Sequence, residues 1–242
     1  MKYSSTRGNS PSVSFIDVLT SGVAPDGGLY IPEAFPRFLE EEIKELKNLS
    51  YQELARNIIY PFLDDFLTNK ELEEVINDAY SSFRSEEVVE LVHDKNIGYI
   101  LELFHGPTFA FKDVAMQLLA GLLNKASEKI DKKIVILGAT SGDTGSAAIE
   151  ACKRYIDIDI FILFPNKKIS KVQQKQMTTS GSANVFPIAI NGDFDDCQDH
   201  VKKLFLEQSS FSQIQFVSIN SINWTRIMAQ SVYFFYTRFK LD

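Results

Sequence analysis

From about residue 90 onward, apolar runs of strand length alternate with segments of helical pattern. The runs that predict strands are "NIGYILELF", "KKIVILGA", "IDIFILFP", "ANVFPIAI" and "QIQFVSI". Helical patterns lie between most of them, at residues 112–130 and in the stretches "SGDTGSAAIEACKRY" and "DFDDCQDHVKKLFLEQ". Strands that alternate with helices indicate a parallel sheet covered by helices. The predicted fold class is therefore α/β.

The residues before this region follow another pattern. The first 35 residues are rich in Gly, Pro and Ser and predict turns with short extended pieces. From Glu40 to about Phe83 the apolar residues recur at helical spacing. The stripe that predicts a core-facing helix consists of Leu72, Val75, Ile76, Ala79, Tyr80 and Phe83. We place a domain boundary near residue 90, between a mostly helical part (1–90) and an α/β part (91–242).

Charge and composition exclude several classes of function. The formal net charge is −7, which argues against a general nucleic-acid or anionic-membrane surface. Two cysteines form no disulfide framework or zinc pattern, and three scattered histidines predict no metal site. The N-terminus has no leader-like apolar segment, and no apolar run reaches membrane-spanning length. We expect a cytoplasmic protein that does not associate with membranes.

One lysine stands in an unusual place, within "LELFHGPTFAFKDVAMQ". Lys112 follows Phe109, Ala110 and Phe111 and opens an apolar helical pattern. A lysine held in apolar surroundings is pushed toward its neutral, nucleophilic form, as carbonyl chemistry requires. The alternative is a lysine that extends its charged end from a core helix into water. The local sequence leaves both interpretations open.

A glycine-rich loop, "GATSGDTGSAA", joins a predicted strand to a predicted helix. It has neither the lysine of a nucleotide-binding P-loop nor the glycine spacing of a dinucleotide site. Ser141, Thr144 and the free backbone N–H groups at the helix start predict a pocket for an anion. A tight turn capped by Thr144 is the alternative. Asp143 would repel a bare anion unless it faces a cation or shares a proton with a nearby phenol or imine. The loop therefore suits a zwitterion such as an amino acid joined to a cofactor.

Several segments together resemble one family. The string "ELFHGPTFAFKDVAM" resembles the pyridoxal-phosphate lysine segment of the threonine synthases, and part of it resembles the wider serine/threonine dehydratase signature. The strings "YSSTRG", "PDGGLYIPE", "TSGDTGSAA", "FPNKKISKVQQKQM", "NGDFDDCQ" and "NSINWTRIMAQ" also look like threonine synthase segments, in that family's order. The resemblance covers essentially all 242 residues. It implies a fold-type-II pyridoxal-phosphate enzyme similar to the tryptophan synthase β-subunit, with residues 1–90 as the family's N-terminal domain and 91–242 as the first part of its catalytic region.

The resemblance also implies a reaction and a set of site residues. The family converts O-phospho-L-homoserine and water to L-threonine and phosphate. Lys112 would carry the cofactor and then act as acid and base. The other implied cofactor contacts are Phe111, His105, Asp143 and Asn223. The implied substrate contacts are Ser141, Gly142, Asp143, Thr144, Gly145, Lys167, Lys168, Asn220 and Ser221.

Some of these residues have simpler interpretations, which stay open. Lys167 and Lys168 suit a solvated basic turn as well as a phosphate site. Asn220 or Ser221 would serve as a helix cap at a polar helix entry. His105 would be a turn residue that orders the loop before Lys112.

The chain departs from the family in one respect. Family members carry a second glycine-rich segment resembling "SGNFGD" that holds the cofactor phosphate, and no such string occurs here. We therefore expect an inactive or partial N-terminal portion that lacks the C-terminal half. Residues 222–242 predict a helix that is apolar nearly all round, with little chain left to cover it. Either a second copy or a continuation of the chain would cover this helix. The alternatives for function are a related dehydratase-type lyase and a non-catalytic module that binds a small ligand.

Overall fold

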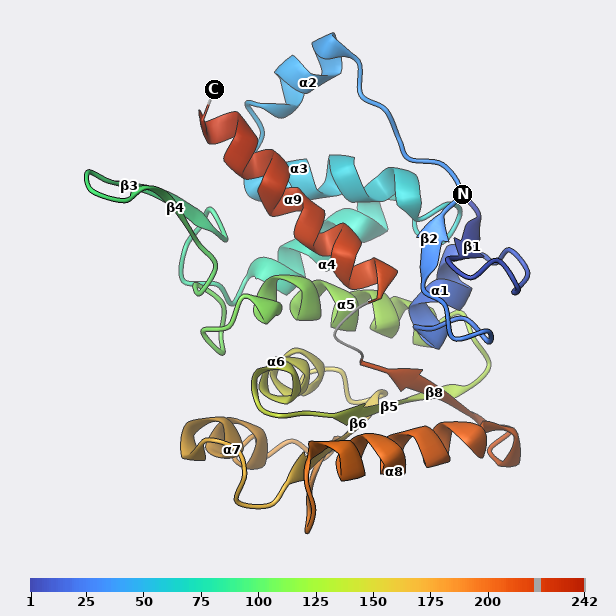
Figure 1. The fold of residues 1–242 in the computed structure, drawn as a ribbon. Coiled ribbons are helices and arrows are strands. Elements are labelled where there is room, and N and C mark those ends of the chain that lie inside the picture. The colour runs from blue at the N-terminus through green and yellow to red at the C-terminus, as the bar shows by residue number, and fades with distance from the viewer. Residues whose placement is uncertain (220–222, 242) are drawn as a thin grey trace.

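The computed structural model describes residues 1–219 and 223–241, shown as a ribbon in Figure 1. The first part of the chain forms two short strands and a group of helices. These elements are β1 (Tyr3–Ser5), α1 (Phe15–Ser21), β2 (Tyr30–Pro32), α2 (Glu40–Leu46), α3 (Tyr51–Ile59), the 3₁₀ turn η1 (Tyr60–Phe62) and α4 (Asn69–Tyr80). Strands β1 and β2 pair antiparallel, which confirms the predicted short extended pieces.

Helix α4 buries the apolar stripe that the sequence predicts. Its buried residues are Leu72, Val75, Ile76, Ala79 and Tyr80. The helix begins with a capping box, in which the Thr68 hydroxyl accepts from the Glu71 amide and the Glu71 carboxylate accepts from the Thr68 amide. Phe83 lies beyond the end of the helix and packs against the same core.

The second part of the chain contains the predicted parallel sheet. Its strands are β5 (Lys133–Ala139), β6 (Asp159–Pro165), β7 (Val185–Ile190) and β8 (Ile214–Ser218), in the order β7-β6-β5-β8. Every neighbouring pair is parallel. The helices of this part of the chain are α5 (Lys112–Ser127), α6 (Asp143–Cys152), α7 (Lys171–Thr178), α8 (Phe194–Leu206), the 3₁₀ turn η2 (Gln208–Ser210) and α9 (Trp224–Leu241). The α/β class with a helix-covered parallel sheet is confirmed.

Helices cover both faces of this sheet (Figure 1). Alternate residues of a strand point to opposite faces. In β5, Ile134 and Ile136 join the large core on the side of α5 and α6, whereas Val135 and Leu137 join a smaller cluster on the side of α8. The large core also includes residues of the N-terminal helices, so the helical part and the sheet pack together. The boundary near residue 90 stays a prediction.

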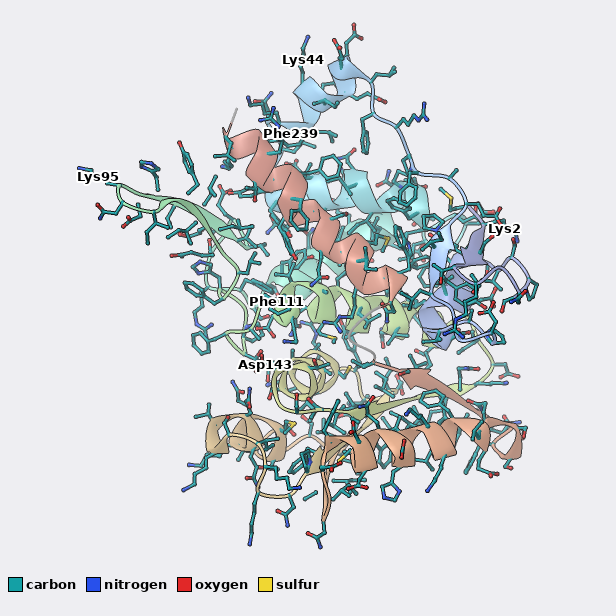
Figure 2. All side chains as sticks on the ribbon, in the orientation of Figure 1. Lys2, Lys44, Lys95, Phe111, Asp143 and Phe239 are labelled. Atoms are coloured by element: carbon teal, nitrogen blue, oxygen red, sulfur yellow. The ribbon has the colours of Figure 1, made fainter. Side chains whose placement is uncertain are left out.

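One predicted strand does not enter the parallel sheet. The run "NIGYILELF" supplies β4 (Gly98–Glu102), which pairs antiparallel with β3 (Glu90–Asp94) in a separate two-stranded hairpin. The physical reason is a local turn, in which the Asp94 carboxylate accepts from the amides of Asn96 and Ile97 at 2.8 and 3.0 Å. The hairpin projects from the body, with Lys95 at its tip (Figure 2).

Helix α9 confirms the helix predicted at the end of the chain. Its buried residues include Trp224, Met228, Val232 and Tyr236. The expectation that little of the chain is left to cover it is wrong, because α1, α3 and α5, which precede it, pack against it. Ile227 and Phe234 stay 42% and 67% exposed on its other side.

Within the described residues, no helix combines the length and the apolar character needed to span a bilayer.

Candidate active site

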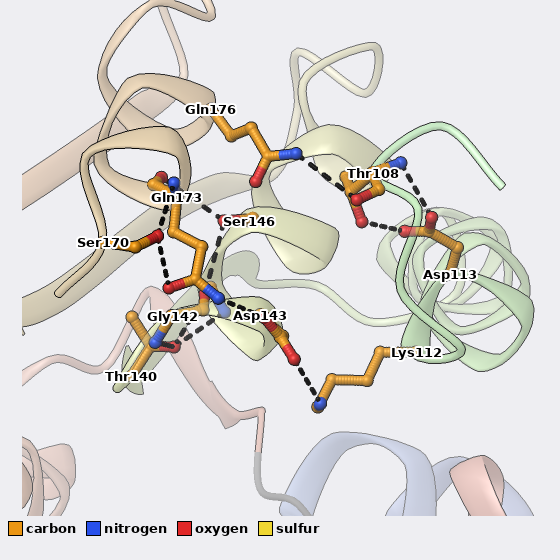
Figure 3. Close-up of polar contacts among 11 residues, drawn as sticks. Thr108, Lys112, Asp113, Thr140, Gly142, Asp143, Ser146, Ser170, Gln173 and Gln176 are labelled. Carbon is orange, nitrogen blue, oxygen red and sulfur yellow. Dashed lines mark hydrogen bonds and ion pairs between the residues drawn. The ribbon is translucent and has the colours of Figure 1, made fainter. Parts of the chain in front are cut away.

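Lys112 is the first residue of α5, and its amine meets a carboxylate (Figure 3). The Nζ atom lies 3.2 Å from Oδ2 of Asp143, the first residue of α6. The Lys112 side chain is 17% exposed, and its Nζ lies 4.4 Å from the centroid of the Phe111 ring. In Figure 2, Phe111 lies at one end of α5, just above Asp143 on α6. Lys112 thus has the apolar neighbour that the sequence suggests, and Asp143 faces the cation that its position requires.

The turn before Lys112 is fixed by a buried acid. Asp113 is fully buried, and its two carboxylate oxygens accept from the amide and the hydroxyl of Thr108 at 2.8 and 2.7 Å. Burial raises the pKa of the Asp113 carboxyl, and the hydrogen bonds from Thr108 oppose that rise. A Cβ at Gly106 would lie 2.4 Å from the Asp113 Cβ, so the turn requires glycine there. Arg84 braces the turn from outside by donating to the Gly106 carbonyl at 2.6 Å.

The glycine loop is organised by a residue just before it. The Thr140 hydroxyl accepts from the amides of Gly142 and Gly145 at 3.0 and 2.9 Å. Gly142 has φ +150°, and a Cβ there would lie 2.3 Å from Oε1 of Gln173. The capping role suggested for Thr144 is wrong, because Thr140 satisfies the third amide of α6 instead.

The first turn of α6 keeps donors available for a ligand. Among the described residues, the amides of Asp143 and Thr144 have no hydrogen-bond partner, and Ser141 is exposed beside them. A helix N-terminus with free N–H groups attracts anions. The loop follows β5 on the side where the chain crosses to β6, while β8 lies on the other side of β5. Ligands of parallel α/β sheets bind outside the carboxyl ends of the strands at such a crossover point.

Lys167, Lys168 and Asn223 do not take part in the contact between Lys112 and Asp143. Lys167 and Lys168 lie exposed in the turn between β6 and α7, where Lys167 has φ +60°. Asn223 is buried, and its side-chain oxygen accepts from the Arg226 amide at 2.9 Å, as a cap of α9 does. Asn220 and Ser221 lie outside the described residues.

His105 contacts a glutamate. Its Nε2 lies 3.0 Å from Glu102 Oε2, and its carbonyl accepts from the Arg84 amide. This agrees with a residue that orders the loop before Lys112. Together with Glu90, the two form a group whose ligand-type atoms lie within 4.8 Å of one another. The sequence did not indicate this group, and paired acids at a hairpin base carry no metal assignment by themselves.

Sequence reasoning missed the contacts made by α7. Gln173 donates from Nε2 to Oδ1 of Asp143, and Gln176 donates to the Thr108 carbonyl at 3.3 Å (Figure 3). The available signal was the spacing of the two glutamines in "KVQQKQM", three residues apart after the capping Ser170. Such spacing places both side chains on one face of a helix.

Comparisons with known proteins agree with this geometry. The model of the family "Threonine synthase N terminus" matches residues 2–80, and that of the family "Pyridoxal-phosphate dependent enzyme" matches residues 86–233. The threonine synthase of Pseudomonas aeruginosa is 47% identical over 241 residues, which are 100% of this chain and 51% of that protein.

Two solved structures are similar over the whole chain. The pyridoxal-phosphate-bound threonine synthase of Brucella melitensis has a TM-score of 0.93 at 48% identity, covering 100% of this chain and 52% of that one. The threonine synthase of yeast has a TM-score of 0.91 at 40% identity, covering 99% and 50%. The chain spans about half the length of the relatives that it matches.

Proposed function

Because the chain belongs to the family of pyridoxal-phosphate-dependent enzymes and has the fold of the threonine synthases, we propose that Lys112 is the residue that binds the cofactor. We further propose that the whole protein converts O-phospho-L-homoserine and water to L-threonine and phosphate. The observation that carries both proposals is the Lys112 amine held 3.2 Å from Asp143 at the mouth of the glycine loop.

The described residues fit this cofactor. An aldehyde needs a primary amine, and the partly buried Lys112 side chain supplies one. The free amides of Asp143 and Thr144 suit an anionic oxygen, and the exposed Ser141 hydroxyl adds another donor. When bound, the cofactor withdraws electrons from the substrate's Cα, while the protein supplies orientation and proton transfer.

The residues of this chain would divide the remaining work. The Lys112 amine would hold and deliver the proton at the substrate carbons, because a positioned amine acts as acid and base. Asp143 would orient that amine, and Ser141, Gly142, Thr144 and Gly145 would hold the substrate carboxylate. Lys167 and Lys168 would attract the substrate phosphate as exposed charges.

Three cofactor contacts are proposed with unequal support. Phe111 lies against the Lys112 amine, which supports a role beside the cofactor. His105 contacts Glu102, so it would act on the cofactor only through the loop that it orders. Asn223 uses its side-chain oxygen to cap α9, which leaves its amide nitrogen for a ligand. Asn220 and Ser221 remain proposed substrate contacts on the resemblance alone.

A cytoplasmic setting is part of the proposal, supported by two buried cysteines that form no disulfide with each other. A second copy packing on the exposed residues Ile227 and Phe234 of α9 is also proposed. Sedimentation of the whole protein tests this association, and a monomer at micromolar concentration would contradict it.

The whole-protein reaction is tested by offering O-phospho-L-homoserine and L-threonine separately, with pyridoxal phosphate present. We expect threonine and phosphate from the first compound. Ketobutyrate from threonine, with no threonine from O-phospho-L-homoserine, would favour the dehydratase-type lyase. The absence of any product from either would favour the ligand-binding module. The matches over both family regions support the first outcome.

A further inference from the structure

Helix α7 contacts both loops that flank Lys112. Gln173 donates to the Asp143 carboxylate, and Gln176, three residues later, donates to the Thr108 carbonyl at 3.3 Å. Figure 3 shows the two glutamine side chains reaching from one helix, Gln173 toward Asp143 and Gln176 toward Thr108. Helix α7 therefore links the loop that carries Asp143 to the turn that precedes Lys112.

The Gln173 side chain is itself held in place. Its Oε1 accepts from the hydroxyl of Ser170, the N-cap of α7, at 3.0 Å. Its backbone carbonyl accepts from the Ser146 hydroxyl at 3.5 Å. The Gln173 side chain also occupies the space where a side chain at Gly142 would otherwise lie. A glutamine with both ends of its amide engaged has one orientation, so its N–H points at Asp143.

This contact decides where the Asp143 carboxylate faces. The Asp143 side chain is 49% exposed, and an exposed carboxylate on a helix start rotates freely unless a neighbour fixes it. Gln173 binds Oδ1, which leaves Oδ2 directed at the Lys112 amine. We propose that Gln173 is a positioning residue, which holds Asp143 and through it the Lys112 amine in the geometry that the reaction uses. This inference rests on the proposed role of Lys112.

A matched pair of variants isolates this effect. Gln173→Met keeps the length and helix preference of the side chain and removes the donor. Gln174→Met makes the same change on the next residue, whose side chain has no hydrogen bond among the described contacts. Gln173→Asn is a second variant, because it keeps an amide that is one methylene too short. Circular dichroism establishes first that each variant is folded.

The measurement is the rate at which acetic anhydride labels Lys112, relative to exposed Lys95 at the hairpin tip, by peptide mass spectrometry. An ion pair slows acylation of an amine, and loss of an ordered pair is worth up to about fivefold. We expect the ratio to rise about threefold in Gln173→Met and Gln173→Asn, and to stay unchanged in Gln174→Met. A local packing role for Gln173 would leave the ratio unchanged.

Two results would overturn the proposal. One is an unchanged labelling ratio in folded Gln173→Met or Gln173→Asn. The other is loss of the folded spectrum in both, which would assign Gln173 to stability alone. Labelling of Lys112 by pyridoxal phosphate and borohydride distinguishes a failure of the proposed function from a failure of this inference. If parent Lys112 takes no label, the proposed function fails. If the parent and Gln173→Met take equal label and show equal acylation, only this inference fails.

Discussion

Both carboxylate oxygens of Asp113 accept hydrogen bonds from a single residue, Thr108, at 2.7 and 2.8 Å. This pair closes the turn that leads into α5 and sets the direction in which Lys112 leaves the chain. Because the acid is fully buried, its effects on stability are open to direct tests.

We predict that Asp113→Ala destabilises the fold by about 2 kcal/mol, because it leaves the Thr108 amide and hydroxyl without buried partners. Asp113→Asn should cost less, because its amide group can pair with both. Urea unfolding of the two variants measures the difference. Equal costs would show that the hydrogen bonds contribute little.

The same acid gives a pH prediction. Burial holds the folded-state pKa of Asp113 above its unfolded value. Its carboxyl therefore favours folding most below the unfolded pKa, and this contribution is lost as pH rises through the folded pKa. Asparagine does not titrate, so Asp113→Asn should gain stability relative to the parent as the pH rises above about 4. A flat or falling difference in urea unfolding would contradict the buried-acid assignment.

The capping box of α4 predicts the opposite pH trend. Hydrogen bonds from the Thr68 amide and hydroxyl lower the pKa of Glu71 below 4.5. The stabilisation is therefore present above the unfolded pKa and lost as pH falls through the folded value. Thr68→Ala should cost about 1 kcal/mol at neutral pH and less at about pH 3. Lys70→Ala, in the same turn, is the control, and a penalty independent of pH would rule out the coupling.

Alanine substitutions at two glycines allow the cost of steric crowding to be measured apart from the cost of the backbone conformation. Gly142 and Gly181 both have positive φ, but a Cβ would meet Gln173 at 2.3 Å only at Gly142, and nothing within 4 Å at Gly181. Gly142→Ala should therefore cost about 1–3 kcal/mol more than Gly181→Ala in urea unfolding. Equal costs would mean that the Gln173 side chain moves aside easily.

Cys152 is predicted to report global unfolding. It is buried against the core, and burial raises the pKa of its thiol to about 12. Because the thiolate is the reactive form, iodoacetamide should not label it in the folded protein at neutral pH. Labelling should follow the urea unfolding curve, as read by peptide mass spectrometry. Rapid labelling without urea would show local opening of α6.

The sequence predicts those features that depend on periodicity and local order. The stripe on α4 and the continuous buried run of β5 appear because burial requires apolar residues at those positions. The position of Lys112 at the start of a helix follows from its apolar neighbours. Asp143 faces a cation, as its negative charge led us to expect, although the sequence did not identify Lys112 as that cation.

Periodicity and local order did not predict the contacts between distant segments. Gln173 meets Asp143 only because α7 folds over the start of α6, thirty residues away in the chain. The β3–β4 hairpin closes through an aspartate turn that competes with entry into the sheet. Thr140 takes the capping role suggested for Thr144 because its hydroxyl lies below the helix start. Periodicity carries no information about such pairings.

Covalent labelling decides whether the Lys112 amine binds pyridoxal phosphate. The whole protein is incubated with the cofactor and reduced with borohydride, and the labelled peptide is mapped by mass spectrometry. We expect one stable label on Lys112 and none at that site in Lys112→Arg. A label elsewhere with Lys112 unmodified, together with full activity of Lys112→Arg, would contradict it.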